Sequence, residues 1–380
     1  MAELYEALMR LSGGDLYPFH MPGHKRALTD PFLKEASALD ITEICGFGNL
    51  YENEGILEEL KEEAARLYGA KRAFLLVNGS TVGVLSALHA ALRPGGKLLM
   101  AKNSHRSAYN AASLLGAGLC FFRQERIEPY GIFGAVTPEA VEEALNRETG
   151  VEAVFLTSPS YEGLLSDVRS IAELCHGRDI PLIVDSAHGA HLGFDKKAEE
   201  EWHAPNAVGE GADVVIESLH KTLPSLTQTA LMFSCSDRVS PEALGDFLFK
   251  FQTSSPSYLL MAGMERCFRF LETGEAAFRE MYRRLKVFRR DLDALRNLRL
   301  FGPELIGKYG ISGFDPSRLL IYAGGEGGFR LTGLLRERYR IEMELSAESY
   351  CLGIATVMDT EEGFIRLAEA LKELDKSAPS

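Results

Sequence analysis

Residues 212–232 read ADVVIESLHKTLPSLTQTALM. The consecutive β-branched residues Val214-Val-Ile216 are typical of a buried strand. Such a strand would carry Lys221 into a loop that Pro224 interrupts, just before a second apolar run at 230–233. An amine in these surroundings is partly desolvated, which lowers the pKa of the ammonium and favours Schiff-base formation. From this segment alone, a buried lysine in a local ion pair explains Lys221 equally well.

The composition is that of a globular protein that buries a large core. With 380 residues, of which 46% are hydrophobic, the chain is expected to form two domains. The net charge of −13 argues against nucleic acid or an anionic membrane as the main partner. The sequence lacks an apolar run of about 18 residues and a signal-peptide pattern, so we expect a cytoplasmic protein. No C-x-x-C pair occurs, and we expect reduced core thiols at Cys45, Cys120, Cys175, Cys235, Cys267 and Cys351.

The N-terminal part alternates between a short helix and irregular segments. Residues 1–12 predict an amphipathic helix that ends at Gly13-Gly14. The segment 17–26, YPFHMPGHKR, contains two prolines and a glycine, so it is either a plain linker or an arm lying over a site. Residues 40–55 are likewise broken by glycine and rich in aromatic residues, which predicts a second loop with a role in contacts.

A regular alternation of strands and helices follows. After a helix at 56–68 and a strand at 72–77, Asn78-Gly-Ser-Thr-Val-Gly83 opens an apolar helix that ends at Leu92. Further strands are predicted at 97–101, 120–123, 153–157, 181–185 and 213–216, with helices at 106–115, 138–147 and 168–176. This order predicts an α/β fold with a mostly parallel sheet, whose ligand lies at the carboxyl ends of the strands.

Polar loops follow several of these strands. Small and hydroxyl residues at 79–81 can form an anion cradle at a helix N-terminus, although serine and threonine are also ordinary helix caps. The other polar loops are Asn103-Ser-His105, Thr157-Ser-Pro-Ser-Tyr-Glu-Gly163, Asp185-Ser-Ala-His-Gly-Ala-His191 and Ser218-Leu-His-Lys221. Each loop alone can be structural, but their meeting at one sheet edge favours a binding site.

The C-terminal third predicts helices and then a small α+β domain. Residues 241–296 are helical in pattern, and the basic residues of 265–297 are better explained by a solvated helix face than by nucleic-acid binding. Strands are predicted at 319–322 and 353–357, with helices at 331–338 and 360–373. The segment Gly324-Gly-Glu-Gly-Gly328 predicts a turn rather than a phosphate loop, because it is acidic.

Together these residues match the needs of pyridoxal 5'-phosphate. The cofactor requires a lysine for a Schiff base, donors for its phosphate, and a carboxylate that keeps the pyridine nitrogen protonated. Lys221 supplies the amine. The remaining roles can be filled by Asp185, Ser80, Thr81, Ser218 and His220, and His105 can stack on the ring.

The same residues resemble the Orn/Lys/Arg decarboxylase family, the group III pyridoxal-phosphate-dependent decarboxylases of the aspartate-aminotransferase-like fold type I. The resemblance covers roughly residues 15–235 and, more weakly, residues 328–344. It departs from the family at Gly48-Asn-Leu50, where members commonly have an acidic pair, and in missing the extra C-terminal domain of longer members. The matching motifs are Met21-Pro-Gly-His-Lys25, Asp40-Ile-Thr-Glu43, Asn78-Gly-Ser-Thr81, Asn103-Ser-His-Arg-Ser107, Pro159-Ser-Tyr-Glu-Gly163, Asp185-Ser-Ala-His-Gly-Ala-His191 and Ser218-Leu-His-Lys-Thr222.

The resemblance implies roles for individual residues. Lys221 would form the Schiff base, Asp185 would contact the pyridinium nitrogen, and His188 would lie near the reacting carbon or the phenolic oxygen. The resemblance further places His105 and Ala187 on the two faces of the ring, and Ser80, Thr81, Ser218 and His220 around the phosphate. No metal is implied. We expect an N-terminal arm and loops at 1–55, a large cofactor-binding domain at 56–264, and a linking helix with a small domain at 265–380.

The implied activity is decarboxylation of lysine, ornithine or arginine to the amine and carbon dioxide, as in polyamine metabolism, by a homodimer with sites at the subunit interface. The candidate acids for a distal cation of the substrate are Glu43, Glu52, Glu54 and Glu162. Two alternatives stay open: another fold type I reaction, namely transamination or an aldolase or lyase reaction, and a non-catalytic partner subunit.

Overall fold

The computed structural model describes residues 3–14, 22, 25, 30–52, 54–128 and 130–377. Of the predicted arm at 17–26, only Pro22 and Lys25 fall within these ranges. The rest of the motif Met21-Pro-Gly-His-Lys25 lies outside the described residues.

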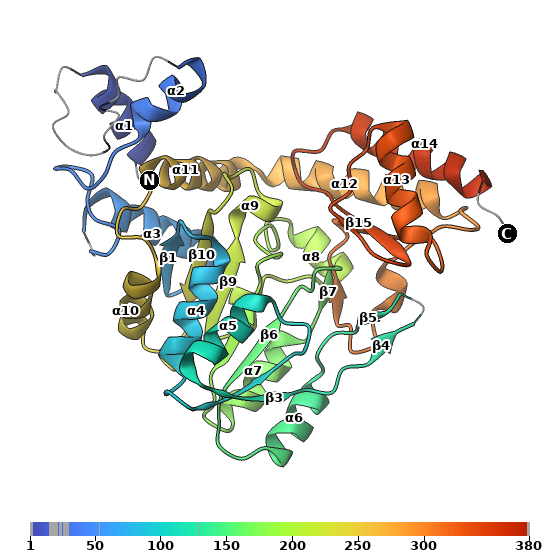
Figure 1. Ribbon diagram of the computed structural model, residues 1–380, viewed down its shortest axis with the longest axis horizontal. Helices are drawn as coiled ribbons and strands as arrows, with labels where there is room; N and C mark the ends of the chain where they lie inside the picture. Colours follow the sequence, from blue (N-terminus) through green and yellow to red (C-terminus); the bar gives the residue numbers. More distant parts are fainter. Residues whose placement is uncertain are drawn as a thin grey trace.

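One seven-stranded sheet forms the centre of the molecule (Figure 1). Strand β10 runs antiparallel to both of its neighbours, and the remaining pairs are parallel. The spatial order is β1 (Arg72–Leu76), β10 (Ala230–Ser234), β9 (Val214–Ser218), β8 (Leu182–Asp185), β6 (Val151–Thr157), β2 (Lys97–Met100) and β3 (Gly118–Phe121). In register, Thr157 pairs with Asp185 and Asp185 pairs with Ile216, so the carboxyl ends of β6, β8 and β9 lie at one edge.

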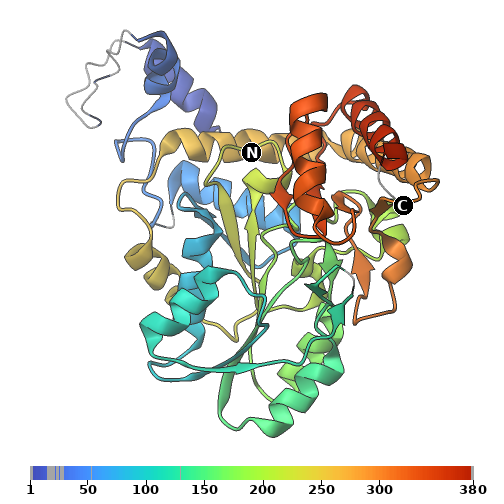
Figure 2. The ribbon, with the colours of Figure 1, turned by 45° about the vertical axis from the view of Figure 1, so that its right-hand side comes forward.

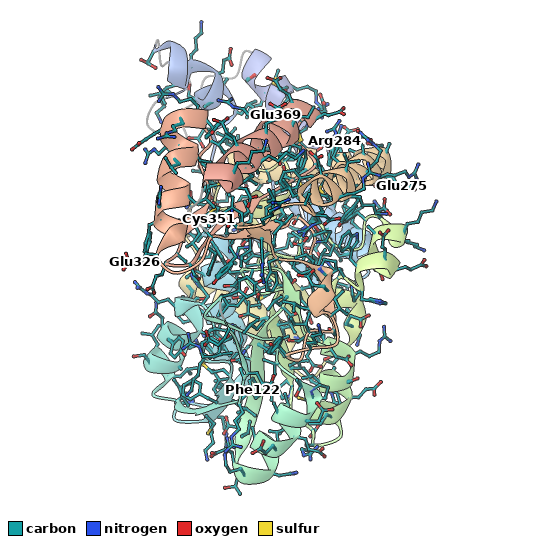
Figure 3. The ribbon with its side chains drawn as sticks, turned by 90° about the vertical axis from the view of Figure 1, so that its right-hand side faces the viewer. Phe122, Glu275, Arg284, Glu326, Cys351 and Glu369 are labelled. Carbon is teal, nitrogen blue, oxygen red and sulfur yellow. The ribbon has the colours of Figure 1, made fainter. Side chains whose placement is uncertain are left out.

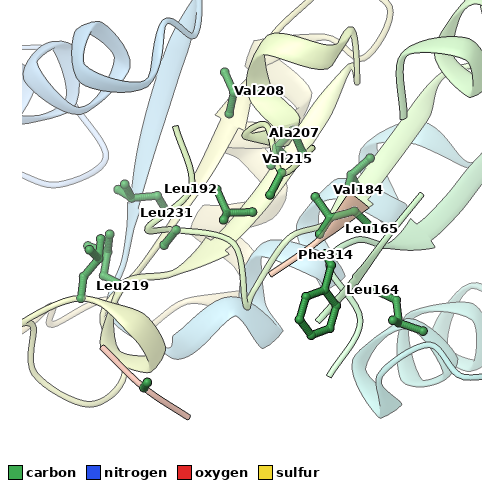
Figure 4. Packing of buried hydrophobic residues seen from close by; sticks show 14 of the residues in the cluster. Leu164, Leu165, Val184, Leu192, Ala207, Val208, Val215, Leu219, Leu231 and Phe314 are labelled. Carbon is green, nitrogen blue, oxygen red and sulfur yellow. The ribbon is translucent and has the colours of Figure 1, made fainter. Parts of the chain in front are cut away.

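Helices cover both faces of this sheet, because successive strand residues point to opposite sides. Val184, Val215 and Leu231 belong to one buried cluster, part of which Figure 4 shows. Ile183, Val214 and Met232 belong to a cluster on the other face. The first face is covered by α3 (Gly55–Tyr68), α6 (Pro138–Arg147), α7 (Val168–His176) and α11 (Tyr258–Thr273), and the second by α4 (Gly79–Ala91), α5 (Arg106–Leu115) and α10 (Pro241–Phe251).

Helix α4 packs on the sheet through a glycine. A Cβ atom at Gly83 would lie 2.7 Å from Leu76 Cδ1 and 3.1 Å from Ile216 Cγ2, and both side chains are fully buried. At Gly83, α4 therefore approaches the sheet more closely than a side chain at this position allows.

We expect Gly83→Ala to destabilise the fold by about 1–3 kcal/mol, the usual cost of overpacking a buried contact. The matched control is Gly333→Ala in α13 (Gly327–Tyr339), where an added Cβ meets nothing within 4 Å. The control should be neutral or stabilising by about 0.5–1 kcal/mol, because alanine favours the helix. Urea unfolding of both variants measures the difference, and equal stability of Gly83→Ala and the unchanged protein would contradict the packing argument.

A second, smaller part follows α11. Helix α12 (Glu275–Leu292) leads to a four-stranded antiparallel sheet. Helix α13 packs against β15 of this sheet, and α14 (Glu361–Ser377) packs against α12 and α13. The strand order is β11 (Arg299–Leu300), β13 (Arg318–Tyr322), β15 (Tyr350–Ile354) and β14 (Leu345–Ser346). In Figure 3, Cys351 of β15 lies inside this layer, whereas Glu275 and Glu369 point outward from their helices.

The two parts are joined by a short antiparallel pair. Strand β12 (Gly313–Phe314) pairs with β7 (Leu164–Leu165), which lies just after β6. Phe314 packs beside Leu164 and Leu165 in Figure 4. This pair lies next to the loop after β6, so it links the small sheet to the edge where the polar loops meet. The other short elements are β4 (Arg126–Ile127), β5 (Ile132–Phe133), α8 (Lys196–Trp202), α9 (Leu219–Thr222), η1 (Ala207–Glu210) and η2 (Pro303–Leu305).

The N-terminal helices α1 (Leu4–Gly13) and α2 (Pro31–Leu39) extend beside α11, away from the central sheet (Figures 1 and 2). The backbone N–H of Tyr5 donates to the buried carboxylate of Glu265, at 2.6 Å from Oε2. Among the described residues, none of the helices is long and apolar enough to cross a membrane.

Most predicted elements are present, with four corrections. The predicted strands at 120–123 and 353–357 begin earlier, as β3 and β15, because strand pairing extends the apolar runs toward their N-termini. The helical segment 265–297 is divided at Gly274, where a Cβ would lie 2.6 Å from Phe270 O. Cys45 is exposed in a turn and Cys120 and Cys235 are only partly buried, so the expectation of core cysteines holds for Cys175, Cys267 and Cys351. The domain limits at 55/56 and 264/265 stay predictions, and α11 runs through the second of them.

Candidate active site

Lys221 lies in the single turn α9, which follows the fully buried strand β9 without a break. Its Nζ lies 3.1 Å from Nε2 of His188. Burial lowers the pKa of the Lys221 ammonium, and the positive charge of Arg318 lowers it further, whereas Asp185 acts in the opposite direction. The amine is therefore more easily deprotonated than that of a surface lysine, which a Schiff-base lysine requires.

Asp185 ends the neighbouring strand β8 and is only 3% exposed. Its Oδ1 accepts a hydrogen bond of 3.1 Å from the backbone N–H of Ala187. Burial raises the pKa of this carboxyl, while Lys221, the Ala187 N–H and His105 act to lower it. A buried carboxylate without a close ion pair among the described residues is suited to a cationic partner such as a protonated ring nitrogen.

His188 is buried beside Lys221. Burial, Arg318 and Lys221 all lower its pKa well below the usual value, so the imidazole is neutral near pH 7. Its Nδ1 is buried and has no hydrogen-bond partner among the described residues. The ring of Tyr161 meets the imidazole edge-on, with centroids 4.8 Å apart. This arrangement fixes the ring and leaves Nε2 able to exchange a proton with the Lys221 amine.

His105 caps the N-terminus of α5, and the ring is exposed. Its Nδ1 accepts from the Ser107 backbone N–H at 3.3 Å and lies 2.8 Å from Ser107 Oγ. The ring is close enough to Asp185 to lower the pKa of that carboxyl. An orientated, accessible imidazole near Asp185 fits the predicted stacking on a cofactor ring.

Ser80 and Thr81 lie in the first turn of α4, where backbone N–H groups have no partner within the helix. The side chain of Asn78, at the N-cap, does not satisfy them, because its Oδ1 accepts from the Thr253 N–H at 3.0 Å. Gly79 has a φ of +73°, a left-handed conformation that favours glycine. This helix N-terminus therefore retains donors for an anion.

Ser218 and His220 flank the same region from β9 and α9. Ser218 Oγ is fully buried and has no hydrogen-bond partner among the described residues. His220 donates from Nδ1 to the Thr229 carbonyl at 2.8 Å, so its Nε2 can donate to a phosphate only when the ring is protonated. An unpaired buried hydroxyl next to an open helix N-terminus fits a phosphate group.

Residues 2–318 match the family described as Orn/Lys/Arg decarboxylase, major domain. The chain belongs to the Orn/Lys/Arg decarboxylase family. It is 32% identical over 365 residues to an arginine decarboxylase of Halalkalibacterium halodurans, covering 94% of this chain and 73% of the relative. It is 30% identical over 380 residues to an arginine decarboxylase of Bacillus subtilis, covering 98% and 76%.

A solved structure supports the same fold. The lysine decarboxylase LdcF of Francisella novicida superposes with a TM-score of 0.85 at 17% sequence identity, covering 99% of this chain and 60% of LdcF. The chain thus spans less than two thirds of that protein. These comparisons confirm the predicted family, the α/β fold and the dependence on pyridoxal phosphate.

The structure brings the predicted residues of this family member to one edge of the sheet. Asp185, Ala187, His188 and Lys221 lie together from β8, β9 and their following loops. His105, Ser80, Thr81, Ser218 and His220 surround them on the helix N-termini and strand ends described above. Their individual roles toward the cofactor stay predictions. Among the described residues, no group of three or more potential metal ligands occurs.

Arg318 is a site residue that the sequence did not indicate. Its side chain is fully buried, and Nη2 donates to the His188 carbonyl at 3.0 Å. Its Nε lies 3.5 Å from Asp315 Oδ2, and Asp315 Oδ1 lies 3.2 Å from His191 Nε2. Although burial opposes it, His191 and Arg318 hold the pKa of Asp315 below its usual value. Arg318 therefore places a fixed positive charge behind His188.

Glu344 was also missed, because its contacts come from the small sheet. It lies just before β14 and is exposed, and its Oε1 accepts a 2.6 Å hydrogen bond from Tyr161 Oη. Its negative charge acts to raise the pKa of Lys221. An acid in the weakly matching segment 328–344 was the only signal in the sequence.

Proposed function

We propose that the protein is a pyridoxal-phosphate-dependent decarboxylase that converts lysine, ornithine or arginine to the amine and carbon dioxide. The observation that carries the proposal is the position of the Lys221 amine, 3.1 Å from the neutral imidazole of His188 and near the buried carboxylate of Asp185. Membership of a decarboxylase family supports the reaction.

When bound, the cofactor supplies an electron sink for the bond that breaks at the substrate Cα. The chain's own residues prepare this chemistry. The Asp185 carboxylate would accept the hydrogen bond of the ring nitrogen and hold its proton. The α4 N-terminus and Ser218 would bind the phosphate. Either Lys221 Nζ or its neighbour His188 Nε2 would donate to the substrate Cα the proton that replaces the lost carboxylate.

A substrate with a cationic side chain needs an acidic partner at the mouth of the site. We propose Glu344 for this role, because it is exposed, orientated by Tyr161 and close enough to influence the charge of Lys221. Of the four acids predicted from the sequence, Glu162 is hydrogen-bonded to Ser160 at 2.9 Å, and Glu43, Glu52 and Glu54 are not among the charges that act on Lys221. These four stay predicted alternatives.

We expect Glu344→Gln to lower kcat/KM for the basic substrate by about 10–100-fold, which corresponds to the loss of one charge-assisted hydrogen bond. The effect should fall mainly on KM, because the distal cation is bound equally before and during the reaction. The control is Glu342→Gln, an exposed acid two residues away that pairs with Arg336 at 3.0 Å. Equal losses in the two variants would contradict a specific role of Glu344.

The activity is tested directly with purified protein, added pyridoxal phosphate and each of the three basic amino acids. Release of carbon dioxide with the matching amine supports decarboxylation. An oxo acid would indicate transamination, the main alternative on this fold. Cofactor binding without any product would favour a non-catalytic partner subunit.

The assembly and location are also proposed. We expect a cytoplasmic homodimer, and the exposure of His105 and Thr81 in the single chain is consistent with a site that a second subunit completes. The amine products would place the enzyme in polyamine metabolism. Sedimentation velocity should give twice the chain mass of 41.9 kDa.

A further inference from the structure

Glu217 is a buried acid that the proposed reaction does not use. It immediately precedes Ser218 in β9, and it is fully buried. Oε1 accepts a hydrogen bond of 2.8 Å from Nδ2 of Asn206, while Oε2 is buried without a hydrogen-bond partner among the described residues. A polar side chain in such a position requires an explanation, because burying a carboxyl group is costly.

Asn206 connects this acid to the loop that carries Asp185 and His188. Its Nδ2 lies 3.4 Å from the Leu192 carbonyl oxygen and 3.5 Å from that of Gly189, and its Oδ1 accepts from the Val208 N–H at 2.9 Å. The amide therefore lies between the end of β9 and the end of the loop 185–192. Removing either partner would leave buried polar groups unpaired at this junction.

A third contact holds the same loop. Tyr68 of α3 donates from Oη to the Ala190 carbonyl at 2.8 Å. The ionisable groups that face Glu217 are Tyr68 from α3 and Cys235 after β10, and burial is the main cause of the raised pKa of both. Neither group is a cation. Burial raises the pKa of Glu217 to about 8, opposed only by the Asn206 hydrogen bond.

We propose that Glu217 is a positioning residue: as a neutral acid bound to Asn206, it fixes the loop 185–192 against β9 and so sets the position of His188 relative to Lys221. This inference rests on the proposed function, because it assigns the contact a task in decarboxylation. The neutral form is suited to the site, since a carboxylate here would meet no positive charge among the groups that act on it.

The direction in which stability changes with pH follows from the pKa of Glu217 in the unfolded and in the folded chain. Glu217 loses its proton near its ordinary value of 4.5 when the chain is unfolded and near 8 when it is folded. Between these values the folded state binds more protons, so this group's contribution to stability falls as the pH rises toward 8 and is constant above it. Above pH 8 the folded protein would hold a buried carboxylate that has the Asn206 amide as a donor but no cation among the groups that act on it. The cost of this buried charge should loosen the junction between β9 and the loop 185–192 and shift His188.

The decisive variant is Glu217→Gln, which keeps the size and the acceptor but cannot ionise. We expect its kcat/KM at pH 7 to stay within about twofold of the unchanged enzyme, with a smaller loss of activity between pH 8 and 9.5. We expect its unfolding temperature to exceed that of the unchanged protein by a margin that grows from pH 5 to 8 and then stays constant. The proposal would be overturned if the variant and the unchanged protein had the same pH profile of activity and differed in unfolding temperature by the same amount at every pH.

Truncation tests the positioning itself. Glu217→Ala and Asn206→Ala should each lower kcat/KM by about 10–100-fold, the scale of a small misplacement of reacting groups. The double variant should lose no more than either single one, because both remove the same contact. Independent, additive losses or full activity of Glu217→Ala would contradict the proposal. Thermal unfolding requires no turnover, so a failure of the proposed reaction leaves the Glu217 titration measurable on its own.

Discussion

Replacing Lys221 with alanine is expected to lower kcat by about 10⁴-fold, the upper range for loss of a group that transfers a proton at the reacting atom. The reason is geometric as well as chemical. The Lys221 amine is half-buried, held next to a neutral imidazole, and has its pKa lowered mainly by burial. Among the described residues, Lys221 is the lysine that contacts His188 Nε2, at 3.1 Å. The variant therefore has no replacement amine at this position.

Borohydride treatment provides the direct measurement. The holoenzyme should acquire one pyridoxyl group on the peptide that contains Lys221, and the Lys221→Ala variant should acquire none on that peptide. A label on another lysine in the unchanged enzyme would contradict the assignment of Lys221, whatever activity the Lys221→Ala variant retains.

Lys61 is the matched control, because it is also a largely buried lysine. Its Nζ donates to the Glu52 carbonyl at 3.0 Å and lies 2.7 Å from Glu58 Oε2. Lys61 thus has the local ion pair that the sequence left open as an explanation for Lys221. We expect Lys61→Ala to lower stability while retaining the pyridoxyl label at Lys221. Loss of labelling in both variants would indicate a general effect on folding.

The sequence indicated where several candidate residues would lie, because these residues follow buried strands. The β-branched run before Lys221 and the apolar strand before Asp185 each end in polar residues, and parallel strands bring such ends to one edge. Local spacing was therefore enough to predict that Asp185, Ser218 and Lys221 lie at one edge, whereas His188 was suggested by the family resemblance, and their roles toward the cofactor stay predictions. Helices α5, α6 and α7 also match their predicted limits, because the residue just before each helix caps it with its side chain.

The residues that the sequence did not indicate reach the site from far along the chain. Arg318 donates to the carbonyl of His188, 130 positions away, and Glu344 accepts from Tyr161, 183 positions away. No periodicity or motif spacing encodes such contacts, since they depend on the pairing of β12 with β7 and on the docking of the small sheet. Glu217 escaped for a different reason. It lies within a run of buried strand residues, and only the structure shows that its carboxyl group faces Asn206.

Replacing Asp185 is expected to lower kcat by about 10³-fold while the protein still binds the cofactor, because an unprotonated ring nitrogen makes a poor electron sink. Two variants separate the charge from the hydrogen bond. Asp185→Asn keeps an acceptor for the Ala187 N–H but has no negative charge, whereas Asp185→Ala removes both. If the charge is the essential feature, both variants lose turnover to a similar degree, and Asp185→Ala alone loses additional stability.

Asp213→Asn is the control for burying an altered aspartate. Asp213 is fully buried next to β9 as well, but its Oδ2 accepts from the Leu182 N–H at 2.7 Å and lies 2.9 Å from His176 Nε2. We expect this variant to lose stability and to keep its kcat, since its partners belong to the fold rather than to the site. Steady-state kinetics with saturating cofactor, together with the cofactor absorbance of each variant, make the comparison. Near-normal turnover in Asp185→Asn would mean that the ring nitrogen is protonated without this carboxylate, and the role of Asp185 would then be confined to holding the backbone of Ala187.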